Sequence, residues 1–315
     1  PAALGTNVPP TNNTDMKTYG WELQIGWRDQ IGDFKYGAKL SLSDSQSKIL
    51  RYGNPTGSLS KYVEGELIGN IYGYTTIGIA KTDEEMQQHL ASLPNGGQSA
   101  LGSQWAAGDI MYADLNGDGK INNGSYTIND MGDMKKIGNS TPRFMTGINL
   151  DAAYKGWDLQ MFWQGVLKRD WWPGDKNMTF WGVTDGEWWS TSFKEHLDYF
   201  RTSENPLGEN LNSYYPRPIF NTKNNKSQTR YLQNAAYMRL KNIQVGYTFP
   251  KVWINKLMLQ NLRIFVSGEN LLTITSLSDT MDPETCGAGY QSTEQANGTV
   301  YPLAKTISFG LSVNF

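Results

Sequence analysis

The segment 114–121 reads Asp-Leu-Asn-Gly-Asp-Gly-Lys-Ile, which matches the first half of a calcium-binding loop. Side-chain oxygens fall at alternate positions, on Asp114, Asn116 and Asp118. Gly119 permits the sharp turn that such loops need, and Lys120 offers its backbone carbonyl as a further ligand. This spacing predicts a calcium ion that stiffens a loop, because calcium is not redox-active and no nucleophile–base pair lies beside the motif.

The closing ligand of this loop is not at its usual place. The twelfth position holds Ser125 where a calcium loop of the EF-hand type has Glu. If the segment 122–129 loops out, either Asp130 or Asp133 can supply the last carboxylate. The alternative is a stack of Asx turns without an ion, which the same residue types favour. We predict a calcium site formed by Asp114, Asn116, Asp118, Lys120 and Asp133.

A second candidate site is rich in tryptophan. The segment 168–189 holds five of them beside several carboxylates: Trp171, Trp172, Trp181, Trp188 and Trp189, with Asp175, Asp185 and Glu187. Exposed indole rings suit sugar stacking or a protein interface. The alternative is that the rings form a small core that lets a long loop fold. We take these five residues as candidates for contact with a substrate or with a partner that covers the site.

No constellation of residues predicts an enzyme. The two histidines, His89 and His196, are far apart and lack zinc-ligand spacing. No Ser-His-Asp, Cys-His or phosphate-binding loop pattern is present. The single cysteine, Cys286, forms no internal disulfide and lies in a Gly-rich segment, where it is expected to be incidental.

Composition narrows the class of protein. The chain has 315 residues, a net charge of -2 and a mean hydropathy of -0.53, with no apolar run of 18 residues. A helical membrane protein is therefore excluded, whereas a membrane β-barrel is not, because its lipid face uses only alternate residues. The balanced charge argues against a nucleic-acid partner. The chain begins at Pro1 without a signal peptide, so we expect a mature chain or a fragment of an exported protein.

Strict alternation of apolar and polar residues recurs along the chain and predicts strands. It is clearest at the end, where Ile307, Phe309, Leu311, Val313 and Phe315 alternate with small or polar residues. A final strand that ends on an aromatic residue is the pattern of outer-membrane barrels, where Phe315 resembles the signal that the barrel-assembly machinery reads. Three hairpins precede it, at 19–43, 144–164 and 237–272. In the third, Arg239 and Lys241 break the alternation, which predicts a β-bulge near Lys241.

The seven predicted strands are joined by connections that alternate in length. Short turns alternate with long loops at 44–142, 165–236 and 273–302, in which helices are expected at Thr82–Leu93 and, with a weaker signal, at Thr191–Arg201. Transmembrane barrels alternate short periplasmic turns with long extracellular loops in this way. The predicted fold class is all-β, an antiparallel transmembrane β-barrel segment. Seven strands do not close a single-chain barrel, so we expect the carboxy-terminal portion of a larger one, with Phe315 in the periplasm.

Side chains on the two faces of the strands agree with a barrel wall. Aromatic residues are expected in one girdle near the periplasmic ends, at Trp27, Phe34, Tyr154, Trp157, Phe249 and Phe315, and in another near the outer ends, at Trp21, Phe144, Trp163 and Tyr237. Polar residues are expected to line the lumen: Glu22, Gln24, Arg28, Lys35, Lys39, Asn149, Asp151, Asp158, Gln160, Arg263 and Glu269.

Several motifs together resemble the carboxy-terminal region of SusC-like TonB-dependent transporters. They are Gly65-Glu-Leu-Ile-Gly-Asn-Ile-Tyr-Gly-Tyr74, the segment from Asp109 to Ile121, Ile137-Gly-Asn-Ser-Thr-Pro-Arg-Phe144, the segment from Tyr237 to Pro250, Phe265-Val-Ser-Gly-Glu-Asn-Leu271 and the final strand. Their order and spacing are also those of the family.

The resemblance implies a barrel of about 22 strands with a plugged lumen in the outer membrane of a Gram-negative bacterium. It also implies a SusD-like surface lipoprotein as a lid, energy from the TonB complex and import of oligosaccharides or, less often, peptides. The loop sequence of the segment 114–121 is a common feature of the family, and the resemblance therefore favours calcium at this loop. The plug and the TonB-contacting segment are absent from these 315 residues. The alternative function is a surface adhesin or glycan-binding barrel without active transport.

Overall fold

A computed structural model of the chain describes residues 12–286 and 303–315. Its main feature is a sheet of seven antiparallel strands in the order β1-β2-β7-β8-β11-β12-β13. These strands are β1 (Asp15–Ile31), β2 (Phe34–Arg51), β7 (Arg143–Tyr154), β8 (Trp157–Lys168), β11 (Tyr237–Thr248), β12 (Asn261–Thr275) and β13 (Thr306–Asn314). Because neighbours in the sheet follow one another along the chain among these seven strands, the predicted all-β meander is confirmed.

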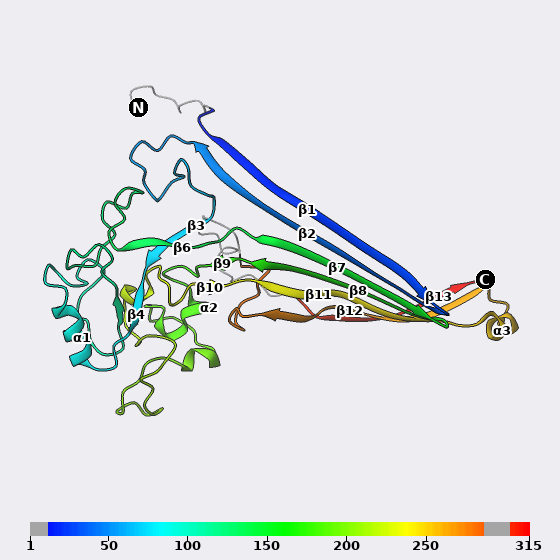
Figure 1. The fold of residues 1–315 in the computed structure, drawn as a ribbon. Helices are drawn as coiled ribbons and strands as arrows, with labels where there is room; N and C mark the ends of the chain where they lie inside the picture. The colour runs from blue at the N-terminus through cyan, green and yellow to red at the C-terminus, as the bar shows by residue number, and fades with distance from the viewer. Residues whose placement is uncertain (1–11, 287–302) are drawn as a thin grey trace, which may run out of the picture.

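The sheet forms a long curved wall, and the long connections gather at one end of it (Figure 1). We call this gathered part the outer lobe: residues 52–142, 169–236 and 276–286. The opposite end carries the short turns, the helical turn α3 (Lys251–Ile254) and the end of β13. Residues 287–302 of the predicted loop 273–302 lie outside the described residues. The alternation of short and long connections therefore separates the two ends of the described sheet as predicted.

One face of the sheet is apolar across its whole width. The register places Phe34, Trp157, Tyr247, Ile264 and Leu311 in one row, and Trp27, Ala38, Leu150, Met161 and Ile243 in another. We call this the apolar face. On the strands at the sheet edges, many of these side chains are exposed, among them Leu23, Ile25, Trp27 and Phe309. Stripes of exposed large apolar side chains are costly in water, so this face is built to meet another apolar medium.

The opposite face, here called the polar face, carries the residues expected in the lumen. Arg28, Asp151, Gln160, Gln244 and Ser267 fall in one cross-strand row of the register. Arg28 lies 3.6 Å from Asp151, and Arg263 lies 2.6 Å from Asp158. In these ion pairs, opposite charges on the polar face neutralise one another across neighbouring strands. The charged residues therefore lie at alternate positions, between the apolar ones.

The β-bulge predicted in the third hairpin is present. Between Leu240 and Asn242 of β11, the partner strand β8 advances by only one residue, from Trp163 to Phe162, so Lys241 is the extra residue of that pair. The pairing with β12 shifts at the same place, where Leu240 lies opposite Leu272 and Asn242 opposite Glu269. The shift returns Leu240 to the apolar face and Arg239 to the polar face, opposite Gln164. It also places Tyr237 on the polar face, where it is buried, so its assignment to the outer aromatic girdle is wrong. The irregularity is therefore what keeps each face uniform along this strand.

Three strands end later in the structure than the sequence pattern predicts. The expected loops 44–142 and 165–236 begin later, because β2 continues to Arg51 and β8 to Lys168, and β12 continues to Thr275 beyond the expected start of loop 273–302. The pattern in sequence ends near Asp44, where both faces of the strand become polar. Pairing of the backbone continues nonetheless, with Ser47 opposite Thr18 and Arg51 opposite Asp15. Register in this upper part is held by hydrogen bonds to a neighbouring strand, which leave no periodic signal.

The outer lobe is built from short elements. Three small sheets pair β3 (Asn70–Tyr74) with β6 (Met134–Asn139), β4 (Thr76–Ile79) with β5 (Ile110–Tyr112), and β9 (Asp170–Trp171) with β10 (Gln233–Asn234). Helices α1 (Asp83–Ala91) and α2 (Met178–Trp181) and the 3₁₀ turns Gly182–Thr184, Lys194–Leu197 and Lys223–Asn225 complete it. A further 3₁₀ turn, Asn255–Leu257, follows α3 at the other end of the sheet. Among the described residues, no helix is long and apolar enough to cross a membrane.

The predicted helix at Thr82–Leu93 is present as α1. Thr82 caps it, because its hydroxyl accepts a hydrogen bond of 3.2 Å from the backbone N–H of Glu85. The Glu85 carboxylate in turn accepts from the N–H of Lys81. The weaker expectation of a helix at Thr191–Arg201 is wrong in extent, since only the 3₁₀ turn Lys194–Leu197 forms there.

Candidate functional site

The predicted calcium loop lies in the outer lobe, directly after β5. The Asp114 carboxylate accepts hydrogen bonds from the N–H groups of Gly117 at 2.7 Å and Gly119 at 2.8 Å. Both glycines have positive φ angles, 74° and 78°, which a side chain would strain. Asn116 and Asp118 turn back on the chain in the same manner, each accepting from an N–H two residues on. The loop is therefore preformed around its carboxylates.

The structure decides which aspartate closes the loop. Segment 122–130 loops out, and within it Asp130 is engaged by the backbone N–H and hydroxyl of Ser125. Asp133, which is buried, returns to the motif and accepts hydrogen bonds from the N–H groups of Leu115 at 2.9 Å and Asn122 at 2.8 Å. Of the two candidates in the sequence, only Asp133 joins the cluster.

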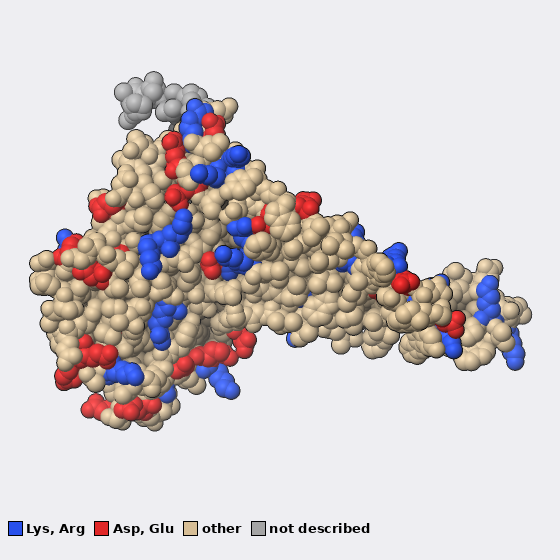
Figure 2. Space-filling view, in the orientation of Figure 1, with Lys and Arg blue, Asp and Glu red and all other residues tan. Residues whose placement is uncertain are grey.

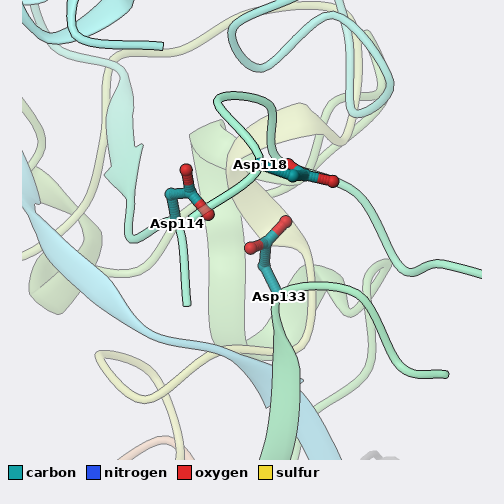
Figure 3. A group of neighbouring side chains, drawn as sticks. All are labelled: Asp114, Asp118 and Asp133. Atoms are coloured by element: carbon teal, nitrogen blue, oxygen red, sulfur yellow. The ribbon is translucent and has the colours of Figure 1, made fainter. Parts of the chain in front are cut away.

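Three carboxylates gather in this cluster. One oxygen from each of Asp114, Asp118 and Asp133 lies within 4.8 Å of the others. Figure 3 shows the carboxylates of Asp114 and Asp133 turned toward each other, with Asp118 beside them on the neighbouring turn. Hard oxygen donors in this arrangement suit Ca²⁺, which takes carboxylate and carbonyl ligands in flexible geometry. The donor set therefore fits the ion.

The electrostatics of the cluster point the same way. Burial, with a smaller contribution from the nearby Asp114 charge, raises the pKa of Asp133, although backbone N–H groups oppose it. Desolvation also acts on Asp114, but the N–H groups of Gly119 and Gly117 outweigh it and hold the pKa of Asp114 below its ordinary value. The one ion pair of these three aspartates among the described residues is long, with Lys120 Nζ 3.9 Å from Asp118 Oδ2. Like charges this close are stabilised by a bound cation.

The tryptophan-rich segment divides into two groups. Trp171 and Trp181 are buried with Phe180, Tyr215 and Tyr231 in the core of the outer lobe. Trp181 and Tyr231 pack at 4.8 Å between ring centroids, and the Trp181 Nε1 donates to the Gly174 carbonyl at 2.9 Å. The prediction that Trp171 and Trp181 contact a substrate or partner is therefore wrong, because a loop this long must first bury its own apolar surface. Trp172 packs half-buried against the same core.

The other two tryptophans are exposed. Trp188 is 79% exposed and Trp189 is 58% exposed, and their rings meet edge to face at 5.3 Å. Trp188 lines a hollow of about 630 Å³ together with Glu187, Arg217 and Phe220. The hollow thus combines an exposed aromatic surface with one acidic side chain, Glu187, and two basic ones, Arg217 and Lys223, a combination that suits stacking and hydrogen bonding to a polar ligand.

A buried ion cluster beneath this hollow was not foreseen from the sequence. Asp109, fully buried, accepts from Arg217 Nε at 2.8 Å, Lys223 Nζ at 2.8 Å and Asn224 Nδ2 at 2.9 Å. Lys223 is itself 2% exposed and lies over the Trp105 ring at 4.5 Å. The partners lie more than 100 residues from Asp109, so no spacing in the sequence could have revealed them. The cluster ties β5, which leads into the calcium loop, to the wall of the hollow.

Opposing effects act on the charges of this cluster. Burial favours the neutral form of Asp109, but the hydrogen bonds from Arg217, Asn224 and Lys223 outweigh it and hold the pKa of Asp109 below its ordinary value. Burial lowers the pKa of Lys223, and Asp109 opposes that shift. The charged state of each group therefore depends on its partner.

Cys286 was expected to be an incidental loop residue, but the structure buries it. The thiol is buried in the core of the outer lobe with Leu277 and Met281, and burial raises its pKa to about 12. It is a packing residue rather than an incidental loop residue, and a thiol with so high a pKa is unreactive. The two histidines take structural roles: the His89 ring pairs with Gln98 and the His196 ring with the Thr179 carbonyl.

The polar face of the sheet holds a hollow of about 740 Å³ lined in part by Arg28, Lys39, Asn149, Asp151 and Gln160. All five were expected to line a lumen, and the structure brings them together. Phe315, the expected assembly signal, follows β13 and is 84% exposed.

Comparison with known proteins completes the description of the chain. No family model matches it. It is 27% identical to TonB-dependent receptor P3 of Formosa agariphila over 337 aligned residues, and 23% identical to TonB-dependent receptor P39 of the same organism. Both alignments cover 100% of this chain. The resemblance to TonB-dependent receptors is confirmed.

The chain spans 30% of receptor P3 and 32% of receptor P39, so it corresponds to about a third of such a receptor. Its fold is similar to that of the RagAB peptide transporter, with a TM-score of 0.67 at 20% identity, covering 100% of this chain and 31% of that one. The RagAB peptide importer in its closed-closed state matches with a TM-score of 0.62 at 18% identity, covering 100% and 31%. The seven-stranded antiparallel sheet and its long connections are therefore similar in fold to about a third of these transporter chains.

Proposed function

We propose that this chain forms the carboxy-terminal part of the wall and extracellular loops of a TonB-dependent outer-membrane importer. The observation that carries the proposal is an apolar face that crosses all seven strands, in a chain similar to TonB-dependent receptors along its whole length. A barrel of about 22 strands would supply neighbours for the outer edges of β1 and β13. In lipid those edges need such neighbours, because unpaired backbone groups there cost several kcal/mol each.

Replacing Leu40 with arginine tests the membrane assignment. Leu40 lies on the apolar face between Ile25 and Ile148, near the middle of the strands. In lipid, Leu40→Arg is expected to destabilise the full-length barrel by about 2–4 kcal/mol, the usual cost of Arg near the bilayer midplane. Urea unfolding of the protein folded into lipid vesicles, followed by its heat-dependent migration on gels, measures the change.

Ser41→Arg is the matched control. Ser41 is the next residue of β2 and faces the polar side, opposite Gln24 and Gly147. We expect a change below about 1 kcal/mol there, because water reaches a lumen. Equal costs at positions 40 and 41 would contradict a lipid-facing surface on this side of the sheet.

We further propose an oligosaccharide as the cargo, with Trp188 and Trp189 among its contacts. Free indole faces beside Glu187 and Arg217 support this, since sugars present apolar ring faces together with hydroxyl groups. A peptide is the alternative cargo, and it is favoured by the similarity in fold to the RagAB peptide transporter. Trp172, which is half-buried against the core of the outer lobe, remains a further candidate for such a contact. A SusD-like lipoprotein would act as the lid over the hollow.

The double substitution Trp188→Ala/Trp189→Ala tests the contact surface. We expect cargo affinity to fall about 30-fold, the loss of about 2 kcal/mol that is typical when an aromatic contact residue is truncated. Folding should be unaffected, because both rings are largely exposed. Binding of plant and algal oligosaccharides and of a tryptic peptide digest to the full-length protein would be measured by fluorescence quenching. Unchanged affinity for both classes would refute the assignment.

Trp181→Ala is the contrasting variant. Its ring is fully buried, so the cost should appear as about 3–5 kcal/mol of lost stability of the outer lobe.

Import that stops when TonB is deleted would separate active transport from the alternative of a surface adhesin. We also propose Ca²⁺ at Asp114, Asn116, Asp118, Lys120 and Asp133 as a stiffening element of the outer lobe, and Phe315 as a signal for the barrel-assembly machinery.

A further inference from the structure

Two lysines face each other at the upper end of the first hairpin. Lys17 of β1 pairs directly with Lys48 of β2. The residues beside them, Thr18 and Ser47, share a hydrogen bond of 2.8 Å on the other face of the ribbon. Since side chains alternate along a strand, Lys17 lies on the same face as Tyr19, Trp21 and the apolar residues below them. The two ammonium groups therefore stand on the apolar face, at its upper margin.

The height of the pair on the sheet can be estimated from strand geometry. From Trp27, the lowest aromatic residue of β1 on the apolar face, to Lys17, β1 rises about 33 Å along its own axis. With the tilt of about 40° that is common in membrane barrels, this corresponds to about 25 Å along the membrane normal. The apolar band of such barrels is also about 25 Å tall. The lysines thus fall where an outer membrane presents the phosphate-bearing headgroups of its outer leaflet.

The pair has no anionic partner among the described residues. Three carboxylates of the upper ribbon and of the segment beside β2 are paired with other cations: Asp15 with Arg51 at 3.0 Å, Glu66 with Lys136 at 3.2 Å, and Asp44 with Arg143. Like charges directly opposite each other destabilise a strand pair. Figure 2 shows Lys and Arg side chains gathered at this end of the β1–β2 ribbon, together with a few carboxylates. An anion that bridges the two ammonium groups would remove their repulsion.

We propose that Lys17 and Lys48 bind a phosphate group of an outer-leaflet lipid. The inference rests on the proposed function, because it requires the apolar face to lie in a membrane. Lysine suits the role, since its aliphatic stem follows apolar surface while its ammonium group reaches the headgroups. The exposed rings of Tyr19 and Trp21 lie below the pair on the same face and would contact the upper part of the acyl chains. The site would hold one lipid beside the first hairpin.

The test uses the full-length protein purified from outer membranes in detergent. Native mass spectrometry would compare the binding of diphosphoryl lipid A with that of the same lipid after its phosphates are removed. We expect the wild type to prefer the phosphorylated lipid at least tenfold, and Lys17→Gln/Lys48→Gln to lose that preference. Lys17→Gln alone, at the more exposed position, should lose part of it. An unchanged preference in the double variant would overturn the proposal.

Lys35→Gln/Lys39→Gln is the matched control. It removes the same charge from β2 but on the polar face, where Lys39 lies opposite Asn149, so the lipid preference should remain. Glucosamine phosphate without acyl chains is the second probe: if it binds as tightly as lipid A, the site recognises a soluble phosphate and the lipid assignment is wrong. Heat-dependent migration of the protein in outer-membrane fractions distinguishes a failure of the membrane-barrel proposal from a failure of the lipid-site proposal. A wild type that fails this assay refutes the membrane barrel itself, whereas a barrel with unaltered lipid binding refutes only the lysine site.

Discussion

Replacing Asp109 with alanine is expected to open the outer lobe while leaving the barrel wall intact. The substitution leaves Lys223, which is 2% exposed, and the half-buried Arg217 without their common carboxylate. Removing one member of a buried ion pair costs about 3–5 kcal/mol, because the remaining charge is buried without compensation. The carbonyls of Ser103 and Gln104 still accept from Lys223 Nζ, but they carry no full charge. The opening equilibrium of the lobe should shift by about 100-fold or more.

Native-state proteolysis of the full-length protein in detergent measures that equilibrium. New cleavages are expected within residues 94–113 and 217–224, the two segments that the ion cluster joins. Asp15→Ala is the control: it removes the Asp15–Arg51 ion pair, in which both side chains are more than half exposed, so its effect should stay below about 1 kcal/mol. Equal protection of the wild type and the Asp109 variant would show that the lobe does not depend on this cluster.

Replacing Asp133 with asparagine is expected to weaken calcium binding at least tenfold. The change removes one of three negative charges around the site, and calcium affinity in such loops follows the number of charged ligands. In wild type, calcium at 100 times its dissociation constant would stabilise the outer lobe by about 2.7 kcal/mol against unfolding. The Asp133 variant should lose most of that stabilisation. Calorimetric titration with Ca²⁺ and proteolysis with and without a chelator measure the two effects.

Asp130→Asn is the matched control for this experiment. Asp130 lies in the same loop and has the same charge, but its carboxylate is engaged by Ser125 outside the cluster. Calcium affinity should be unchanged in that variant. If both substitutions weaken binding equally, the closing ligand is not Asp133. If a chelator alters neither protein, the three aspartates form Asx turns without an ion.

The strands were predictable because one physical cause acts on each of them. A face against an apolar medium and a face against a polar one force a period of two, which is visible in 15–30 residues without any long-range information. The bulge at Lys241 was visible for the same reason, since it corrects a break in that period. The boundaries at Asp44, Gly165 and Thr273 were wrong because strands that leave the apolar band lose the period but keep their pairing.

The outer lobe was much less predictable. Trp171 and Trp188 have the same chemistry in sequence, yet one is buried and the other is 79% exposed. Trp171 packs against Phe180, and the likewise buried Trp181 packs against Tyr215 and Tyr231, rings that approach only when the chain has folded. The partners of Asp109 and the choice of Asp133 over Asp130 are decided in the same way, by contacts that carry no local signal.

By itself, the sequence determined the class of this protein: an antiparallel sheet with one apolar face, joined by short turns and long loops, and a run of oxygen-bearing side chains at 114–121. These properties follow from local periodicity and local spacing, so they can be inferred from short stretches of consecutive residues. Only the tertiary structure decided which aspartate lies beside Asp114 and Asp118, which tryptophans remain exposed, and that Lys17 meets Lys48 at the margin of the apolar face. Those outcomes depend on register and burial, which arise when segments distant in the chain come together.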